Sequence, residues 1–399
     1  MKRRLLMILL ALMIILSGCA GKSEEPGVTE NEYPVVETGF KSVSKYGNIM
    51  LTVSPDTMRE LGYEPGDIIT VSIGEVSVDM PVGTDYTDAD SGEPICCYKY
   101  SSSNDAEVVY VAINAGNFME VNGIGTSHPI DQEPEFEWDL SDGFTPDMPI
   151  YISMKEKQGY AEEYAMHQHG STRSNKREDY DYLTDAEYAN FRAVETTGMG
   201  KGTLYRSSSP VNPAYKRNTE ADEALVDAGI TSIVNMADSE AKMRSYDGYA
   251  MTYYSQCVIM PLDMAMDFTT DDFRQKLAQG FRFIAESEGP YLIHCNEGKD
   301  RTGFAVALLE ALMGADINEI IDDYMRTFYN FYKIDKSSPQ YMEIAQGNIL
   351  QNLEKAFGVT SLTDSRADLK SLAEQYLIGI GMSSEEIEKL RENLSADHN

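Results

Sequence analysis

The chain has 399 residues, and its 65 acidic side chains outnumber the 33 basic ones, which gives a formal net charge of −32 at pH 7. A chain this acidic lacks the basic footprint that nucleic-acid binding requires, so we expect no nucleic acid among its partners. Hydrophobic residues make up 42% of the chain, which is enough for one or two substantial cores. Only 5 cysteines are present, too few for a disulfide scaffold.

The N-terminus has the three parts of a secretory signal. Basic residues at 2–4 precede an apolar run at 5–16, which is shorter than the roughly 20 residues of a transmembrane helix. The run ends in Leu16-Ser17-Gly18-Cys19, which resembles the bacterial lipoprotein signal. This resemblance implies a signal peptide at 1–19 with a lipidated Cys19. We therefore expect an extracytoplasmic protein that a lipid holds to the bacterial cell membrane.

Two segments with different composition follow the signal. Residues 20–40 are rich in Glu, Pro, Gly and Ser without any periodicity, which predicts a flexible tether. From 41 to 155 the sequence changes to short β-rich runs separated by Gly, Pro and Asp turns. This spacing predicts a small β-barrel or sandwich as an accessory domain. A linker at 156–184 separates it from a second domain at 185–399.

Three short motifs in the β-rich region carry a resemblance of their own. Tyr46-Gly47-Asn48, Gly66-Asp67 and Asn114-Ala115-Gly116-Asn117 are together similar to the β-rich C-terminal domain of S-adenosylmethionine hydroxide adenosyltransferases. The other half of that enzyme has no counterpart in this sequence. The resemblance therefore implies a binding or spacing module rather than adenosyl transfer.

The second domain contains the most informative segment of the chain. Residues 294–303 read His-Cys-Asn-Glu-Gly-Lys-Asp-Arg-Thr-Gly. An apolar strand at 291–293 precedes this segment, and apolar residues at mostly helical spacing follow it from Phe304 onward. The pattern predicts a loop that curls around a helix N-terminus, where backbone N–H groups and the helix dipole favour an anion.

The side chains of this loop suit attack by sulfur on a phosphate monoester. Cys295 supplies the nucleophile, because the field of the loop stabilises its thiolate, and the planar guanidinium of Arg301 can hold two phosphoryl oxygens. Thr302 can hydrogen-bond the sulfur as it leaves, and His294 is expected to orient the loop. The residues expected to bind the phosphate are Asn296, Glu297, Gly298, Lys299, Asp300 and Arg301. This chemistry requires neither a metal nor a cofactor.

The segment 294–303 resembles the phosphate-binding loop of the bacterial tyrosine phosphatase family, a branch of the cysteine-dependent phosphatases that includes protein and lipid phosphatases. The likeness extends over roughly residues 185 to 395, for example at 202–207 and 228–236. It implies an α/β fold in which helices flank a central sheet, preceded here by the small β-rich domain. Where the family usually has Asp-Leu-Arg, this chain has Asn235-Met236-Ala237, which removes an arginine.

Two aspartates compete for the role of general acid, the group that protonates the leaving oxygen. Asp263 follows an apolar strand at 257–260 and best matches the acid loop of the family, although Asp267 and its neighbours Asp271 and Asp272 are near enough to replace it. Asp300 is the rival, because the resemblance is to a subgroup with Lys-Asp inside the loop. In similar enzymes, the charge of Lys299 goes with acceptance of phosphoinositides.

These observations predict a phosphomonoester hydrolase that acts through a cysteinyl-phosphate on Cys295, with phosphotyrosine in proteins as the first substrate class. A phosphoinositide or inositol phosphate is the alternative substrate. A second alternative is a lipoprotein that binds phosphate or a partner without catalysis, in which the β-rich domain is the working part. The presence of both Cys295 and Arg301 argues against this last alternative.

Overall fold

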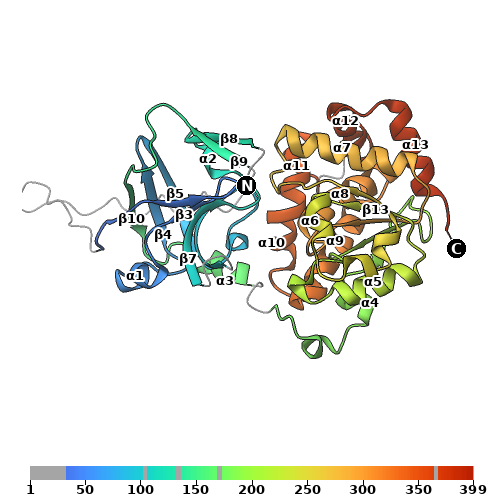
Figure 1. Cartoon of the computed structure of the whole chain (residues 1–399), viewed down its shortest axis with the longest axis horizontal. Helices are drawn as coiled ribbons and strands as arrows, with labels where there is room; N and C mark the ends of the chain where they lie inside the picture. The colour runs from blue at the N-terminus through green and yellow to red at the C-terminus, as the bar shows by residue number, and fades with distance from the viewer. Residues whose placement is uncertain (1–32, 102–105, 131–135, 169–172, 364–366, 399) are drawn as a thin grey trace, which may run out of the picture.

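The computed structural model describes residues 33–398 except 102–105, 131–135, 169–172 and 364–366. The predicted signal peptide and Cys19 lie outside the described residues. Among those described, no helix combines the length and the apolar character that crossing a membrane requires. The chain forms two lobes that lie side by side (Figure 1). We call them the β lobe, which ends with strand β10, and the α/β lobe, which begins with helix α4.

The β lobe is built on one curved sheet with the strand order β1-β10-β4-β5-β6-β7-β3-β2. Its strands are β1 (Val36–Thr38), β2 (Phe40–Val43), β3 (Ile49–Leu51), β4 (Ile68–Ile73), β5 (Val76–Gly83), β6 (Pro94–Ser101), β7 (Ala106–Ile113) and β10 (Ile150–Glu156). The two edge strands, β1 and β2, are consecutive in the chain and separated by Gly39 alone, so the sheet curls round toward a barrel. The sequence-based expectation of a β-rich barrel or sandwich domain therefore describes this lobe.

Alternating residues of the strands fill the interior of the β lobe. In β4, Ile69, Val71 and Ile73 are buried while the residues between them are partly exposed, as expected for a strand with one face toward a core. The remaining elements of the lobe are the hairpin β8 (Gly125–Pro129) and β9 (Phe136–Leu140), and the helices α1 (Pro55–Glu60) and α2 (Phe118–Val121).

Regular structure also occurs in both segments that composition assigns to connections. Strand β1 and the start of β2 lie within 20–40, the expected tether, because Val36 is only 5% exposed and packs into the core of the β lobe. Helix α3 (Ala161–His167) lies within 156–184, the expected linker. Burial of Val36 thus helps to order β1 within a segment of polar composition.

The α/β lobe has a five-stranded sheet with the order β11-β12-β15-β13-β14. Its strands are β11 (Arg192–Ala193), β12 (Leu204–Ser207), β13 (Ser232–Asn235), β14 (Val258–Pro261) and β15 (Tyr291–His294). All neighbours pair in parallel except β11 and β12. Every residue of the central strand β15 is buried, as is typical of a parallel sheet covered on both faces.

Helices surround this sheet. They are α4 (Asp185–Tyr188), α5 (Asn218–Asp227), α6 (Glu240–Arg244), α7 (Asp271–Glu286), α8 (Asp300–Met313), α9 (Ile317–Tyr332), α10 (Tyr341–Ala345), α11 (Gln351–Phe357), α12 (Leu369–Gly379) and α13 (Ser384–Ser395). Helix α8 is buried from Arg301 to Leu312 and contacts β15, α9 and α12. The loop at 295–299 therefore leads from the buried central strand β15 into the buried helix α8. Both ends of the loop are fixed by these elements.

The lobes contact each other through a turn of the β lobe and the helices α10 and α11, which face it in Figure 1. The N–H of Ser91 donates to the carbonyl of Gly347 at 3.1 Å, and the Ser91 hydroxyl donates to Asn352 at 3.1 Å. Gly347 has no room for a side chain here, because an added Cβ would lie 2.1 Å from Asp90 Oδ1. This close fit places the ends of β5 to β7 beside the phosphate loop.

Candidate active site

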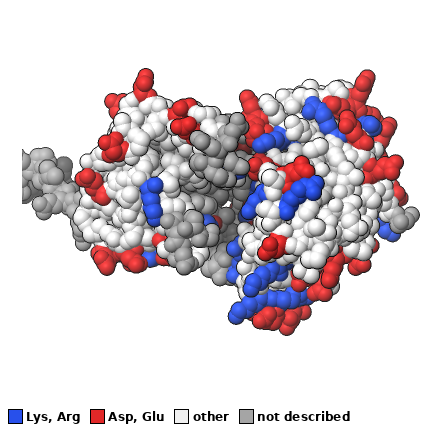
Figure 2. Space-filling model, viewed as in Figure 1, with Lys and Arg blue, Asp and Glu red and all other residues white. Residues whose placement is uncertain are grey.

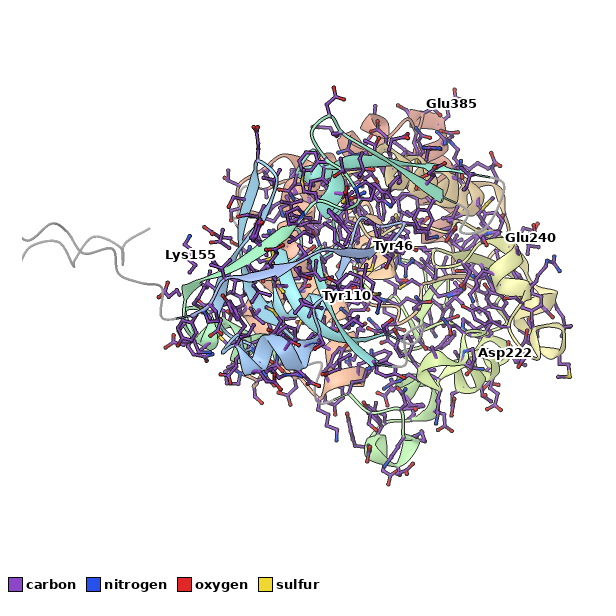
Figure 3. All side chains as sticks on the ribbon, turned by 60° about the vertical axis from the view of Figure 1, so that its left-hand side comes forward. Tyr46, Tyr110, Lys155, Asp222, Glu240 and Glu385 are labelled. Carbon is purple, nitrogen blue, oxygen red and sulfur yellow. The ribbon has the colours of Figure 1, made fainter. Side chains whose placement is uncertain are left out.

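The predicted loop lies between β15 and α8, at the carboxyl end of the parallel strands. Cys295 directly follows β15, is 3% exposed and lines a cavity of about 630 Å³. The cavity is formed by both lobes, and Figure 3 shows Tyr46 of the β lobe near the middle of the molecule, where it contributes to the wall. The predicted nucleophile is therefore inside the molecule but open to a ligand.

Arg301 forms the wall of the same cavity with part of its guanidinium unsatisfied. Its Nη1 donates to the carbonyl oxygen of Met264 at 2.8 Å, which fixes the side chain. Its Nε is buried and has no hydrogen-bond partner in the described part of the chain. A buried donor without a partner is costly, and a phosphoryl oxygen is the acceptor that a guanidinium prefers.

The backbone of the loop is held from its buried side. Arg206 donates to the carbonyl of Gly298 at 2.8 Å, Asn190 to that of Glu297 at 3.0 Å, and the Ser209 N–H to that of Asn296 at 3.0 Å. Because a trans peptide holds its N–H opposite its C=O, the N–H groups that follow these carbonyls point the other way. Carbonyls directed inward and amides directed outward are what an anion-binding loop needs.

Arg206 is itself held in place by a buried ion-pair network. It forms a short contact with Asp323, and Arg192 donates to the same carboxylate at 2.8 Å. Burial by itself would raise the pKa of Asp323. The charges of Arg192 and Arg206 outweigh this effect and lower the pKa below its ordinary value. The network keeps the Arg206 guanidinium directed at the loop carbonyl.

His294 lies behind the loop and does not line the cavity. Its two ring nitrogens are 2.9 Å from the Tyr254 hydroxyl and 3.2 Å from the Cys295 carbonyl. Burial lowers the pKa of His294 to about 4, so the ring is neutral at pH 7. These contacts suit a residue that orients the loop. Thr302 is also buried, and its hydroxyl has no hydrogen-bond partner among the described residues, the sulfur of Cys295 included.

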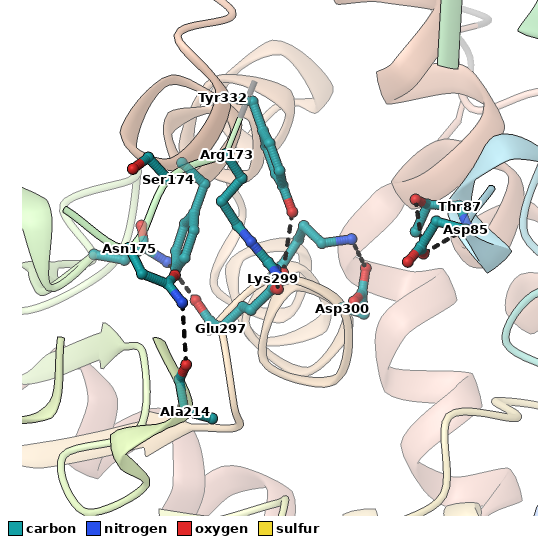
Figure 4. A network of polar contacts seen from close by, with 12 residues as sticks. Asp85, Thr87, Arg173, Ser174, Asn175, Ala214, Glu297, Lys299, Asp300 and Tyr332 are labelled. Carbon is teal, nitrogen blue, oxygen red and sulfur yellow. Dashed lines mark hydrogen bonds and ion pairs between the residues drawn. The ribbon is translucent and has the colours of Figure 1, made fainter. Parts of the chain in front are cut away.

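Glu297 and Lys299 form the polar rim of the site with residues from outside the loop (Figure 4). The Glu297 carboxylate pairs with Arg173 and accepts a hydrogen bond from Tyr332 at 3.2 Å. Lys299 pairs with Asp300 at 2.8 Å. Burial by itself would lower the pKa of Lys299. The nearby Asp300 carboxylate has the opposite effect, and the pKa of Lys299 lies well above its ordinary value.

Arg173 was not among the residues that the sequence singled out. It comes from the segment expected to be a linker, and its guanidinium lies 4.6 Å from the ring centroid of Tyr215 as well as beside Glu297. No motif surrounds it in the sequence, so only the folded chain reveals it.

The candidate acids occupy different places. Asp300 and Asp267 line the cavity, whereas Asp263 does not. The carboxylate of Asp263 lies 3.4 Å from Nζ of Lys45, so it points to the β lobe. Asp271 and Asp272 are largely exposed in the first turn of α7 and are absent from the cavity wall. The geometry therefore favours Asp300, the rival in the sequence-based prediction, over Asp263.

The departure from the Asp-Leu-Arg pattern affects the cavity directly. Ala237, at the position of the missing arginine, lines the cavity. Asn235 is buried, where its side-chain amide donates to Asp238 at 3.2 Å and to Tyr254 at 3.1 Å. The short side chain of Ala237 thus leaves space that an arginine would fill.

The β lobe supplies a further part of the wall, which the sequence did not predict. Lys99, Asp85 and Tyr86 line the cavity, and so do residues 113–117 and Asn48. Two of the three motifs that resemble adenosyltransferase sequences therefore lie at this boundary. Figure 4 shows Asp85 on the far side of the cavity from Glu297. Within the described ranges, no group of three or more His, Cys, Asp or Glu side chains is arranged to hold a metal ion.

Comparisons with known proteins agree with the motif. A model of the tyrosine phosphatase family matches residues 187–396. The triple specificity protein phosphatase PtpB of Mycobacterium tuberculosis is 38% identical over 74 residues, which are 16% of this chain and 26% of that protein. A tyrosine-protein phosphatase of Nostoc commune is 30% identical over 122 residues, 28% of this chain and 42% of that protein. The match thus spans less than half of the length of either relative.

Two solved structures are also similar. TpbA of P. aeruginosa in complex with phosphotyrosine is 19% identical with a TM-score of 0.28, over 44% of this chain and 86% of that one. The core catalytic domain of a PP-IP phosphatase from S. cerevisiae in complex with citrate is 20% identical with a TM-score of 0.27, over 39% of this chain and 83% of that one.

The family match lies in the α/β lobe, so the resemblance of the β lobe to S-adenosylmethionine hydroxide adenosyltransferases stays a prediction. The matched segment contains the strand, the loop and the helix that carry Cys295 and Arg301. Since the family model covers more than half of the 399 residues, the chain belongs to the tyrosine phosphatase family.

Proposed function

We propose that this protein hydrolyses phosphate monoesters through a cysteinyl-phosphate on Cys295. The observation that carries the proposal is the unsatisfied Nε of Arg301 in the wall of the cavity that contains the Cys295 sulfur. The outward-facing amides of the loop add further donors for the phosphoryl oxygens. Together they form a site for a tetrahedral anion next to a nucleophile.

The reaction has two steps. In the first, the Cys295 thiolate attacks phosphorus, the bond from phosphorus to the leaving oxygen breaks, and that oxygen takes a proton from an acid. In the second, a water molecule attacks phosphorus and gives its proton to the same carboxylate, while the sulfur–phosphorus bond breaks. Inorganic phosphate and the thiolate are the products of this step.

Asp300 is the acid that we propose, because it lines the cavity beside the loop. Its partner Lys299 is almost fully buried, so the lysine side of this ion pair is shielded from solvent. A phosphoryl dianion would compete with Asp300 for Lys299, which would release the carboxyl group for proton transfer.

Phosphotyrosine in proteins is the first substrate class that we propose. Tyr46, Tyr86, Tyr215 and Tyr332 line the cavity, and aromatic rings offer edge and face contacts to a phenyl phosphate. The relative from Nostoc commune, a tyrosine-protein phosphatase, supports the same class by its name. An inositol phosphate or a phosphoinositide is the second candidate, favoured by the additional cations of the cavity wall, Lys99, Arg173 and Lys299.

The test is a substrate panel with trapping of the intermediate. Purified protein is expected to release phosphate from an aryl phosphate, a phosphotyrosyl peptide and inositol phosphates, and rapid acid quenching with mass spectrometry should find phosphate on Cys295. Hydrolysis without any phosphocysteine in the wild-type protein would contradict this mechanism.

We also propose that a lipid on Cys19 holds the protein to the outer side of the bacterial cell membrane. The sequence of residues 1–19 supports this proposal by its basic start, its short apolar run and its final cysteine. The substrate would then be met outside the cytoplasm.

A further inference from the structure

The β lobe directs a lysine into the catalytic cavity. Lys99, in β6, lines the same cavity as Cys295 and Arg301. Its ammonium group forms a short ion pair with Asp85 and lies 4.9 Å from the ring centroid of Tyr86. The side chain is 30% exposed, so the cation is held in the wall rather than extended into solvent.

Lys99 faces two further cations. Burial lowers the pKa of Lys99 to about 8, and the charges of Arg173 and Lys299 act in the same direction against the opposing charge of Glu297. Lys99 and these two cations therefore lie close enough for their charges to act on one another, although each of them is paired with a carboxylate. On the molecular surface, the basic side chains of the α/β lobe gather mainly on the half nearer the β lobe in the view of Figure 2.

The carboxylates in the same wall are already occupied. Asp88 accepts hydrogen bonds from Thr84 and from the Asp85 N–H, and Asp267 accepts two from Thr269. Asp85, which pairs with Lys99, also accepts from Thr87 at 3.3 Å and 3.2 Å. An ammonium group has three donors, so the pair with Asp85 leaves Lys99 able to bind another anion.

We propose that Lys99 binds a second phosphate group of a small ligand whose first phosphate lies at Cys295. The β lobe would thereby select compact, multiply phosphorylated polyols, either free or as the headgroup of a lipid. Because both lobes line the cavity, a ligand inside is enclosed on two sides, which favours a compact molecule over an extended peptide. This inference rests on the proposed hydrolysis of phosphate monoesters, and it makes the second candidate substrate class, the inositol phosphates and phosphoinositides, more specific.

The experiment compares ligands that differ by one phosphate. With the purified full chain, kcat/KM is measured for an inositol bisphosphate and for the matching monophosphate, in the wild type, Lys99→Met and Lys99→Arg. We expect Lys99→Met to lower the preference for the bisphosphate about tenfold or more, which is the usual effect of losing a charged hydrogen bond. Lys99→Arg keeps the charge and should retain most of the preference.

Lys155→Met is the matched control. Lys155 also pairs with an aspartate of the β lobe, Asp79, but it lies outside the cavity wall and at the outer edge of the lobe in Figure 3. The Lys155→Met variant should keep the preference for the bisphosphate at the wild-type value. If Lys99→Met lowers kcat/KM equally for both ligands, or if the wild type prefers the doubly phosphorylated ligand neither in solution nor as a phosphoinositide in vesicles, the inference is wrong.

Two further arms identify the source of the second phosphate and separate this inference from the proposed function. A preference that appears with phosphoinositides in vesicles but not with soluble inositol phosphates assigns a lipid headgroup. A preference confined to doubly phosphorylated peptides overturns the proposed ligand class. Absence of phosphate release from every substrate of the panel would refute the proposed function itself, whereas hydrolysis without any bisphosphate preference refutes only the role of Lys99.

Discussion

The guanidinium of Arg173 pairs with the carboxylate of Glu297, which ties the segment between the lobes to the phosphate loop. Tyr332 donates to the same carboxylate from the end of α9. The loop is thus fixed from two directions at a residue next to Gly298, where its backbone turns. The orientation of its amides depends on contacts with distant parts of the chain.

Arg173→Ala should therefore lower kcat/KM on an aryl phosphate by about tenfold, because Glu297 loses the cationic partner that holds its side chain and the loop beside it. Steady-state kinetics measures this loss of activity, and thermal unfolding shows whether the variant is still folded. Arg244→Ala removes an exposed pair with Glu240 and serves as the control, with activity expected within twofold of the wild type. Equal kinetics in the two variants would show that the Arg173 pair does not position the loop.

Cys295→Ser should abolish turnover while preserving phosphate binding. The loop amides and Arg301 remain, but the serine hydroxyl is a poor nucleophile in a site built for a thiolate. We expect a loss of about 10²-fold or more in kcat, and inorganic phosphate should still raise the unfolding temperature of the variant. Turnover within tenfold of the wild type would rule out sulfur as the nucleophile.

The leaving group distinguishes Asp300 from Asp263. Removal of the true acid should slow a tyrosyl phosphate far more than an activated nitrophenyl phosphate, since only the basic leaving oxygen needs a proton. We expect Asp300→Asn to show this selective loss, roughly 10²-fold on the tyrosyl ester. Asp263→Asn should change both rates alike, because it only loses its contact with Lys45. The opposite pattern would return the role of acid to Asp263.

Gly298→Ala should damage the loop more than its backbone angle alone would suggest. Gly298 has a φ of +70°, and an added Cβ would lie 2.2 Å from the Ser207 carbonyl oxygen. Gly358 has a φ of +66° with nothing within 4 Å, so Gly358→Ala isolates the cost of the angle, about 1 kcal/mol. The free energy of unfolding, measured with a denaturant, and kcat/KM should both fall further in Gly298→Ala than in Gly358→Ala. Similar losses of stability would mean that the loop relaxes around the methyl group.

Cys19→Ser tests the anchor. If Cys19 carries the lipid, the variant should leave the membrane fraction or keep its signal peptide, because two acyl chains are needed for stable attachment. Fractionation with an alkaline wash, followed by intact-mass measurement, reads out both results. Retention of a processed Cys19→Ser variant on the membrane after that wash, at the level of the wild type, would contradict the lipoprotein assignment.

The sequence by itself determined the chemical core of the site. Residues 291–293 are an apolar run bounded by turn residues, and α8 begins at Asp300, five positions after Cys295, so the strand, loop and helix arise from signals only a few residues apart. Cys295 and Arg301 are six positions apart in the sequence and line one cavity in the structure. Local conformation brings them near each other, and contacts from distant parts of the chain then orient the loop.

Only the tertiary structure decided what surrounds that core. Arg206 and Asn190 support the loop, and Arg173 and Lys99 reach the cavity, from segments that are separated from it by about ninety to two hundred positions in the sequence. Nothing in the residues next to these side chains shows where they point, because packing between the two lobes fixes their positions. The choice between Asp263 and Asp300 depends on the same packing, since Lys45 of the β lobe contacts the first and the cavity opens beside the second.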